Sequence, residues 1–260
     1  FQPERVNPPG AQTAYSNYAT SLAGLIVEIV SGVPFNDYVQ QNIFDPLGMT
    51  RSSFQEPLPA NLEEHMAGSY KVELGAYVEK DFEIIANFGP AGAQSATAPD
   101  MVRFGQAILN GGVLDGKRIL KAETVEEMLT PNFSHDDRTT AMLLGFYETD
   151  YNGHRVVGHG GDTIYFHSYL GIDHEADLVF FVSFASGGGS PTRSAFAPAL
   201  YNQFFPRNES PPAPPEDFLE RGAKYAGNYG FWRGNFSKIE KAFTLGSSIQ
   251  VALTEDNTLL

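Results

Sequence analysis

Apolar side chains near the start of the chain recur at the spacing of an α-helix. The stretch 18–31 carries a stripe at i, i+3 and i+4 intervals, formed by Leu22, Leu25, Ile26, Ile29 and Val30. Gly32 follows the stripe and favours the left-handed conformation that ends many helices. Pro34 cannot continue the helix. The pattern therefore predicts an amphipathic helix that ends at residue 31.

Three further helices are predicted from capping and breaking residues. The first begins at Asn36, which can cap it, and runs to Ile43. The second covers residues 97–110, where Pro99 suits the first turn and a Gly-Gly pair follows the end. The third covers residues 122–129 and stops before a proline.

The hydrophobic period changes after residue 150. Residues 154–157, 165–172 and 178–184 are short runs of β-branched and aromatic side chains, separated by Gly, Asp and His. Such runs predict successive antiparallel strands. Residues 196–205 return to helical spacing and would pack on that sheet. The order of these elements predicts an α+β fold, an antiparallel sheet flanked by helices.

A proline-rich stretch indicates a domain boundary. Residues 206–215 contain five prolines, a composition typical of a stiff linker. We therefore expect a first domain over residues 1–207, a Pro-rich linker over 208–218, and the start of a small C-terminal all-β domain over 219–260.

Composition and charge narrow the functional classes. The chain has 260 residues, of which 42% are apolar and 20 are Phe, enough to form a core. A net charge of −14 argues against binding to nucleic acid or to anionic membranes. No apolar run reaches the length of a membrane span. The absence of cysteine excludes disulfides, thiolate metal sites and a cysteine nucleophile.

The segment Tyr15-Ser16-Asn17 is the first candidate for catalysis. A serine hydroxyl is a weak nucleophile that needs a neighbouring base. A tyrosine, with an ordinary pKa near ~10, serves as a base only where positive charge favours its phenolate. The Asn17 amide can donate a hydrogen bond to a substrate carbonyl. The alternative is an ordinary helix start with Asn17 as the cap.

The segment His159-Gly160-Gly161 is the second candidate. It ends an apolar strand, and two glycines allow a ligand to approach the backbone closely. The alternative is a glycine-rich hairpin turn with an incidental histidine. His167 and Asp162 also lie near this segment and invite a metal assignment. Against it, His154 and His159 are five positions apart on a strand and point to opposite faces. We therefore predict no metal site.

In this order, the two segments resemble the second and third motifs of the serine β-lactamase and penicillin-binding protein superfamily, nearest to its class C, D-alanyl-peptidase and esterase branch. Residues 89–92, 95–101 and 109–112 also resemble that branch. The first motif, Ser-x-x-Lys, is absent, because no serine of the chain has lysine three positions on. The chain also opens on Phe1. We therefore expect an internal fragment whose β-lactamase-like sheet is incomplete N-terminally.

The resemblance implies roles for individual residues. Tyr15 would be catalytic, and the backbone N–H of Asp162 would form half of an oxyanion hole. The implied substrate-binding residues are Asn17, His159, Gly160 and Gly161. Tyr165 stands where relatives often have glycine and could narrow the cleft or displace the loop.

The resemblance also implies a reaction and a location. The intact protein would be a serine hydrolase that cleaves an amide or ester through an acyl-enzyme, with a nucleophile outside this fragment, and the fragment alone would be inactive. It would need no cofactor, bind a small-molecule or peptide substrate and act outside the cytoplasm. Two alternatives stay open: a non-catalytic penicillin-binding or scaffold protein that retains the fold, and a binding module built around the C-terminal region.

Overall fold

The computed structural model describes residues 4–207, 213–230, 239–246, 248–255 and 258–259. The chain divides into two compact units. The larger unit is Ser16–Pro206, and the smaller one combines Phe1–Tyr15 with Arg207–Leu260. The predicted domain boundaries stay predictions, and the first linker residues, 208–212, lie outside the described residues.

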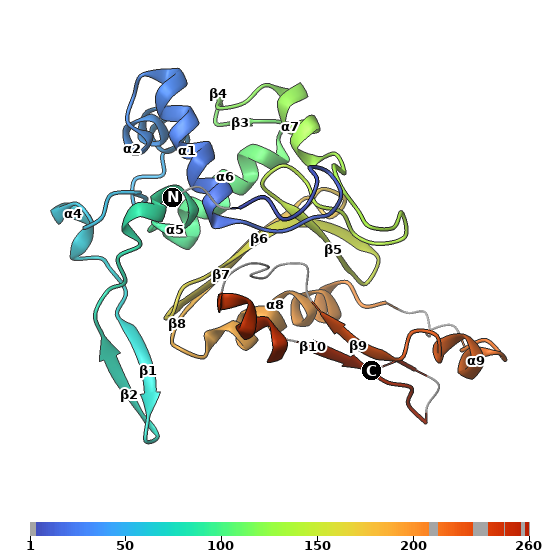
Figure 1. Ribbon diagram of the computed structural model, residues 1–260. Helices are drawn as coiled ribbons and strands as arrows, with labels where there is room; N and C mark the ends of the chain where they lie inside the picture. The colour runs from blue at the N-terminus through green and yellow to red at the C-terminus, as the bar shows by residue number, and fades with distance from the viewer. Residues whose placement is uncertain (1–3, 208–212, 231–238, 247, 256–257, 260) are drawn as a thin grey trace. The chain divides into compact units, whose positions relative to one another are not determined.

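A four-stranded antiparallel sheet in the order β5-β6-β7-β8 organises the larger unit (Figure 1). Its strands are β5 (Tyr147–Tyr151), β6 (His154–Asp162), β7 (Phe166–Asp173) and β8 (Leu178–Ala185). Each strand pairs with the next along the chain, as in the register Val157↔Ile172 and Gly171↔Phe180. The predicted antiparallel order is confirmed, and β5 is an additional strand that the sequence pattern did not reveal.

The two faces of this sheet form separate cores. Successive side chains of a strand point to opposite faces, so Val156 and Val157 of β6 enter different clusters. Val157 packs with residues of α6 (Ala98–Leu109) and α7 (Ala122–Leu129). Val156 packs with residues of α8 (Gly189–Phe204). The sheet is therefore covered by helices on both faces.

Helix α6 begins as predicted. The Thr97 hydroxyl accepts a hydrogen bond from the Asp100 backbone N–H at 3.4 Å, as N-cap residues do. The buried Asp100 carboxylate in turn accepts hydrogen bonds at 2.8 Å from the Arg51 N–H and from the Ser52 hydroxyl. The helix start is thus tied to the preceding loop. Helix α7 has the predicted bounds.

Helix α1 (Asn17–Ser31) ends as predicted, at Gly32 with φ of 69°. Its apolar stripe is not buried, since exposure ranges from 42% at Leu22 to 81% at Val30. Within this unit the helix instead buries Gly24, where an added Cβ would lie 2.4 Å from Pro90 Cγ. The close approach of the Pro90 turn, rather than the stripe, sets this packing.

The helix predicted to begin at Asn36 differs in its start and length. Helix α2 (Phe35–Val39) has Pro34 as its N-cap residue, and the Asn36 amide donates to the Phe54 carbonyl at 3.2 Å. The Asn36 side chain therefore binds a neighbouring loop and does not cap the helix. The prediction that Asn36 caps this helix was wrong. The chain continues through a π-helix, η1 (Gln40–Phe44), and α3 (Asp45–Leu47).

Apart from α6, the elements between residues 48 and 120 are short. They are α4 (Ala60–Glu63), η2 (Ala86–Phe88), α5 (Gly89–Gly92) and the hairpins β1–β2 (Ser69–Glu73, Ala76–Lys80) and β3–β4 (Val113–Leu114, Lys117–Arg118). The β1–β2 hairpin extends away from the helices (Figure 1). The Tyr70 carbonyl of β1 accepts a hydrogen bond from the Gly187 N–H at 2.7 Å. The hairpin is thereby joined to the chain just after β8.

The smaller unit mixes helix and strand. It contains α9 (Phe218–Gly222), β9 (Gly227–Gly230), the 3₁₀ helix η3 (Ile239–Gly246) and β10 (Ser248–Val251). β9 pairs with β10 antiparallel. The expectation of an all-β region was wrong for its described residues, because they form α9 and η3 as well as the two strands.

Among the described residues, no single helix is long and apolar enough to cross a membrane. Helix α1 and the α2–α3 segment (Phe35–Leu47) meet the length and composition criteria only when taken together, with a bend of 80° between them.

Candidate active site

The second half of strand β6 has one open edge. On one side, β5 pairs with β6 only as far as Tyr147↔Gly158. On the other side, pairing with β7 continues to Asp162↔His167. Within the described strands, residues 159–162 therefore have a strand partner on one side only. An exposed strand edge of this kind can pair with an extended ligand.

The backbone N–H of Asp162 points to this open edge. Successive residues of an antiparallel strand direct their N–H groups to alternate edges. The Gly160 N–H donates to Tyr147 Oη at 2.8 Å, on the β5 side. The Thr163 N–H donates to the Phe166 carbonyl at 2.9 Å, on the β7 side. Asp162 lies between them in this alternation, so its N–H faces the same side as that of Gly160.

The two glycines of the motif have different surroundings. A Cβ atom on Gly160 would lie 2.1 Å from Arg193 Nη1 and 3.0 Å from Tyr147 Oη, so no larger residue fits without moving them. A Cβ atom on Gly161 would meet no atom within 4 Å. A side chain at position 160 would therefore displace the Arg193 guanidinium on the α8 face, whereas Gly161 borders open space on the opposite face.

The Asp162 carboxylate is held by two side chains. His167 Nδ1 lies 2.6 Å from one carboxylate oxygen, and Arg193 Nη2 lies 2.9 Å from the other. Both partners are shielded, with 8% of the His167 side chain and 16% of the Arg193 side chain exposed. The strand register places His167 opposite Asp162, and Arg193 belongs to α8, which covers this face of the sheet. This network fixes the residue whose N–H faces the open edge.

Asp162 and His167, which invite a metal assignment, thus form a hydrogen-bonded pair. Among the residues that the structure describes, no group of three or more His, Asp or Glu side chains is placed to hold a metal ion.

The turn after β6 is anchored by Glu83. Its carboxylate accepts hydrogen bonds from the Thr163 hydroxyl at 2.6 Å, the Ile164 N–H at 2.8 Å and the Tyr165 N–H at 2.9 Å. The Tyr165 ring lies against Gly187, where an added Cβ would be 3.3 Å from its Cδ1. The bulky residue that replaces the expected glycine is therefore packed on the segment after β8.

His159 lies on the face of the sheet that carries α6. It alternates with Gly160 and shares its face with Val157. Its ring centroid is 5.5 Å from that of Tyr147. Burial lowers the pKa of His159, and the Gly160 backbone opposes this effect in part. The imidazole is therefore neutral at pH 7.

His154 lies on the opposite face, as predicted. Its Nδ1 is 2.9 Å from Asp173 Oδ2, and the same oxygen accepts a hydrogen bond from the Tyr201 hydroxyl at 2.8 Å. The Asp173 carboxylate is fully buried and also accepts two backbone hydrogen bonds at 3.0 Å. This cluster secures α8 to the sheet.

Asn17 and Tyr15 lie at the start of α1. Asn17 is the first residue of the helix, and the N-cap is Ser16, whose hydroxyl accepts a hydrogen bond from the Ala19 N–H at 3.2 Å. The alternative in which Asn17 caps the helix was therefore wrong. Tyr15 precedes the cap, belongs to the smaller unit and is 38% exposed. Their functional roles stay predictions.

The sequence reasoning missed three residues of this site. Tyr147, Arg193 and Glu83 come from β5, α8 and the segment after β2, and each contacts residues 160–165 of the β6 end. Strand alternation could have shown that Asp162 lies on the same face as Val156, because an even number of positions separates them on the strand. That face is the one that α8 covers. No local pattern identifies its partner there, since that depends on how α8 packs.

The comparison with known families settles the classification. The family model described as Beta-lactamase matches residues 1–201. The chain belongs to the beta-lactamase family. The described helices and antiparallel strands agree with the α+β architecture of solved relatives. The resemblance read from the two short motifs is thereby confirmed.

The chain matches only part of the length of each relative. Penicillin-binding protein 4 of Amycolatopsis lactamdurans is 30% identical over 172 residues, 63% of this chain and 44% of the relative. The D-amino acid amidase from Ochrobactrum anthropi SV3, solved with D-phenylalanine, is 26% identical with a TM-score of 0.58, covering 70% of this chain and 53% of that one.

A third relative extends the match in fold. The octameric penicillin-binding protein homologue from Pyrococcus abyssi has a TM-score of 0.64 at 23% identity and covers 96% of this chain but 52% of that one. The chain thus spans about half the length of these solved relatives.

Proposed function

We propose that the intact protein is a serine hydrolase that cleaves an amide or ester bond through an acyl-enzyme. The observation that supports this most is the open edge of β6 with the N–H of Asp162 directed to it. No serine in the 260 residues has lysine three positions on. The proposal therefore places the nucleophile outside residues 1–260.

In the proposed reaction, the serine oxygen attacks the substrate carbonyl carbon and its proton passes to a base. The carbonyl oxygen becomes an oxyanion that accepts hydrogen bonds from the Asp162 N–H and from the N–H of the serine itself. Collapse of this intermediate expels the amine or alcohol, which takes up the proton. Water then attacks the ester and releases the acid, with the serine regenerated.

Tyr15 and Asn17 are assigned supporting roles in this scheme. Tyr15 would be the base, provided that a neighbouring cation favours its phenolate. The Asn17 amide would donate to the substrate carbonyl next to the scissile bond.

His159 bears on the choice of substrate. Burial lowers its pKa, so it offers one neutral N–H donor rather than a positive charge. We therefore propose uncharged amides and esters as preferred substrates, ahead of penicillins, which carry a carboxylate. One solved relative is named D-amino acid amidase. An N-acylated D-amino acid amide, which carries no charge, is therefore the first compound to test.

The location of the reaction follows from the same proposal. Penicillin-binding proteins among the relatives suggest action outside the cytoplasm, on a small-molecule or peptide substrate. A protein that retained the fold without turnover would bind such compounds but not become acylated.

Acylation of a specific serine is the test. The longest natural form of the protein is treated with a fluorescent penicillin and a reactive ester, and the labelled peptide is found by mass spectrometry. We expect one labelled serine outside residues 1–260, and slower labelling by roughly 10²–10⁴ in Tyr15→Phe. Tyr18→Phe, three residues later and within α1, is the matched control. A label within residues 1–260, or no label at all, would overturn the proposal.

A further inference from the structure

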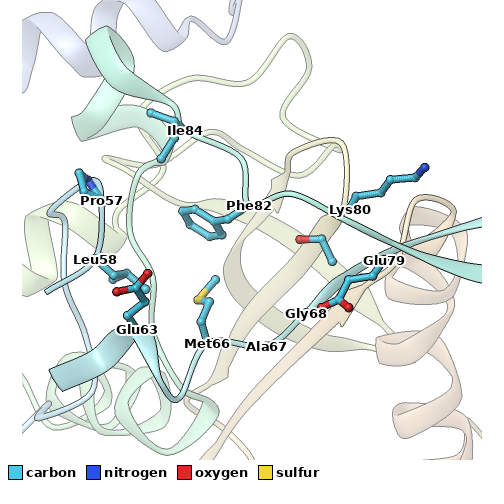
Figure 2. Close-up of a pocket in the computed structure, with 11 residues that line it drawn as sticks. Pro57, Leu58, Glu63, Met66, Ala67, Gly68, Glu79, Lys80, Phe82 and Ile84 are labelled. Carbon is cyan, nitrogen blue, oxygen red and sulfur yellow. The ribbon is translucent and has the colours of Figure 1, made fainter. Parts of the chain in front are cut away.

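A pocket of about 370 Å³ lies between the loop that holds α4 and the end of β2. Its walls come from the segment 57–69, which includes α4, and from residues 79–84 at the end of β2 and beyond. Leu58, Met66, Phe82 and Ile84 make one part of the lining apolar. Figure 2 shows the Phe82 ring in the middle of the pocket, with the Met66 side chain directed toward it. The volume falls within the range of roughly 300–1,000 Å³ that small-molecule sites occupy.

The pocket is physically joined to the candidate active site. The Phe82 ring contacts that of Phe166, the first residue of β7, with centroids 6.5 Å apart. The next residue, Glu83, holds the turn of residues 163–165 through three hydrogen bonds. A group bound against Phe82 therefore lies next to the turn that begins one residue after Asp162.

The polar part of the lining is acidic. Glu63 and Glu79 line the pocket, and the structure records no hydrogen bond or ion pair for either side chain within the described residues. Lys80 also lines it, but its ammonium pairs with Glu73 at 2.9 Å, and its side chain extends away from Phe82 and Met66 (Figure 2). The charge available to a ligand is therefore negative.

We infer that this pocket binds an apolar group that carries a cationic amine. The apolar walls suit an aromatic or branched side chain, and a glutamate on either side of the pocket (Figure 2) suits an ammonium attached to it. An anionic or neutral group of the same size would lack this attraction. That the bound group is a substituent of the hydrolase substrate rests on the proposed function, whereas binding itself does not.

Binding can be followed without turnover through methionine methyl groups. The chain has five methionines, of which Met66 lines the pocket and Met49 is buried in a separate core cluster. With ¹³C-methyl methionine, the Met66 signal is assigned from Met66→Leu and titrated with 2-phenylethylamine. 2-Phenylethanol serves as the neutral counterpart. We expect both to move the Met66 signal and leave Met49 unmoved, with the amine binding about threefold more tightly or better.

Three variants sharpen the test. Glu63→Gln combined with Glu79→Gln should bring the amine and the alcohol to equal affinity, whereas Glu126→Gln on α7 should change neither. Phe82→Leu should weaken both ligands alike. The Met49 signal reports whether each variant is folded. If Phe82→Leu does not fold, the surface glutamate variants still test the inference.

Two results would overturn the inference: an unmoved Met66 signal, or an amine preference that the double glutamate variant retains. Failure of the hydrolase proposal gives a different pattern. A protein that is never acylated can still show the Met66 response, and an acylated one can lack it.

Discussion

The two faces of the four-stranded sheet both have apolar cores but differ in their polar groups. The face under α8 has an apolar core around Val156 with a carboxylate at each end. Asp162, which is partly exposed, is held by His167 and Arg193, and the buried Asp173 is held by Tyr201 and His154. The face under α6 is apolar around Val157 and carries the uncharged His159 and open space at Gly161. One strand therefore serves both as the anchor of a polar scaffold and as a surface free to meet a ligand.

The difference between the faces shows how the Gly160-Gly161 segment is held in one conformation. A Gly-Gly segment alone has high conformational freedom. Here the next residue, Asp162, is clamped from the α8 face, and the turn beyond it is held by Glu83. The Asp162 N–H is thereby oriented before any ligand arrives, which is the condition for electrostatic stabilisation of an oxyanion.

Removal of the buried Asp173 carboxylate should give the largest effect on stability. Asp173→Ala leaves the Tyr201 hydroxyl, His154 and two backbone N–H groups without their shared acceptor. We expect a loss of about 3 kcal/mol or more in the free energy of unfolding, measured by urea denaturation. Asp137→Ala, in an exposed loop, is the matched control. Equal denaturation midpoints for the two variants would show that the α8 face does not depend on this cluster.

The two glycines compare the faces directly. Gly160→Ala places a methyl group where Arg193 pairs with Asp162, and we expect a loss of about 1–3 kcal/mol in the free energy of unfolding. Gly161→Ala faces open space and should change the free energy of unfolding by less than about 1 kcal/mol. Thermal denaturation of both variants measures the contrast. A larger loss for Gly161→Ala would reverse the assignment of faces.

The pH dependence of stability should reveal the neutral histidine of the α6 face. Because burial lowers the pKa of His159 in the folded state, the unfolded chain binds the proton first as the pH falls. The free energy of unfolding then decreases as the pH drops below the unfolded-state value of about 6.5. His159→Gln should make this decrease shallower between pH 7 and 5 and leave stability above pH 8 with the same pH slope.

The remaining slope in that variant has a second source. His174 also has a lowered pKa, chiefly through burial and then through the charge of Arg155. A wild-type slope that His159→Gln leaves unchanged would mean that His159 is not buried in the neutral form.

The sequence was sufficient for elements whose signals are local. Helix α7 ends before a proline, helix α6 starts at a capping threonine, and the strands β6 to β8 show as apolar runs between turn residues. It failed where a longer-range contact decides. Asn36 reaches a carbonyl 18 residues away, a partner that no capping rule contains.

The candidate site also combines residues with local sequence signals and residues that depend on long-range packing. The backbone edge at residues 159–162 could be predicted, because a motif and strand alternation specify it. Its supports could not, since Tyr147, Glu83 and Arg193 come from three elements whose packing the sequence pattern does not define. Asp162 was predicted for its N–H alone, and the role of its carboxylate emerged only from the register with β7.

The central claim is that the N–H of Asp162, held from the α8 face, stabilises the oxyanion at the open edge. Asp162→Pro removes both the N–H and the carboxylate, whereas Asp162→Ala removes the carboxylate alone. Proline is tolerated where the N–H faces away from the strand partner, and Gly161 before it places no Cβ against the ring. The acylation rate of the longest natural form is measured for both variants with one ester, alongside thermal denaturation. We predict that Asp162→Pro is slower than Asp162→Ala by about 10²–10³ at equal stability; equal rates would contradict the account.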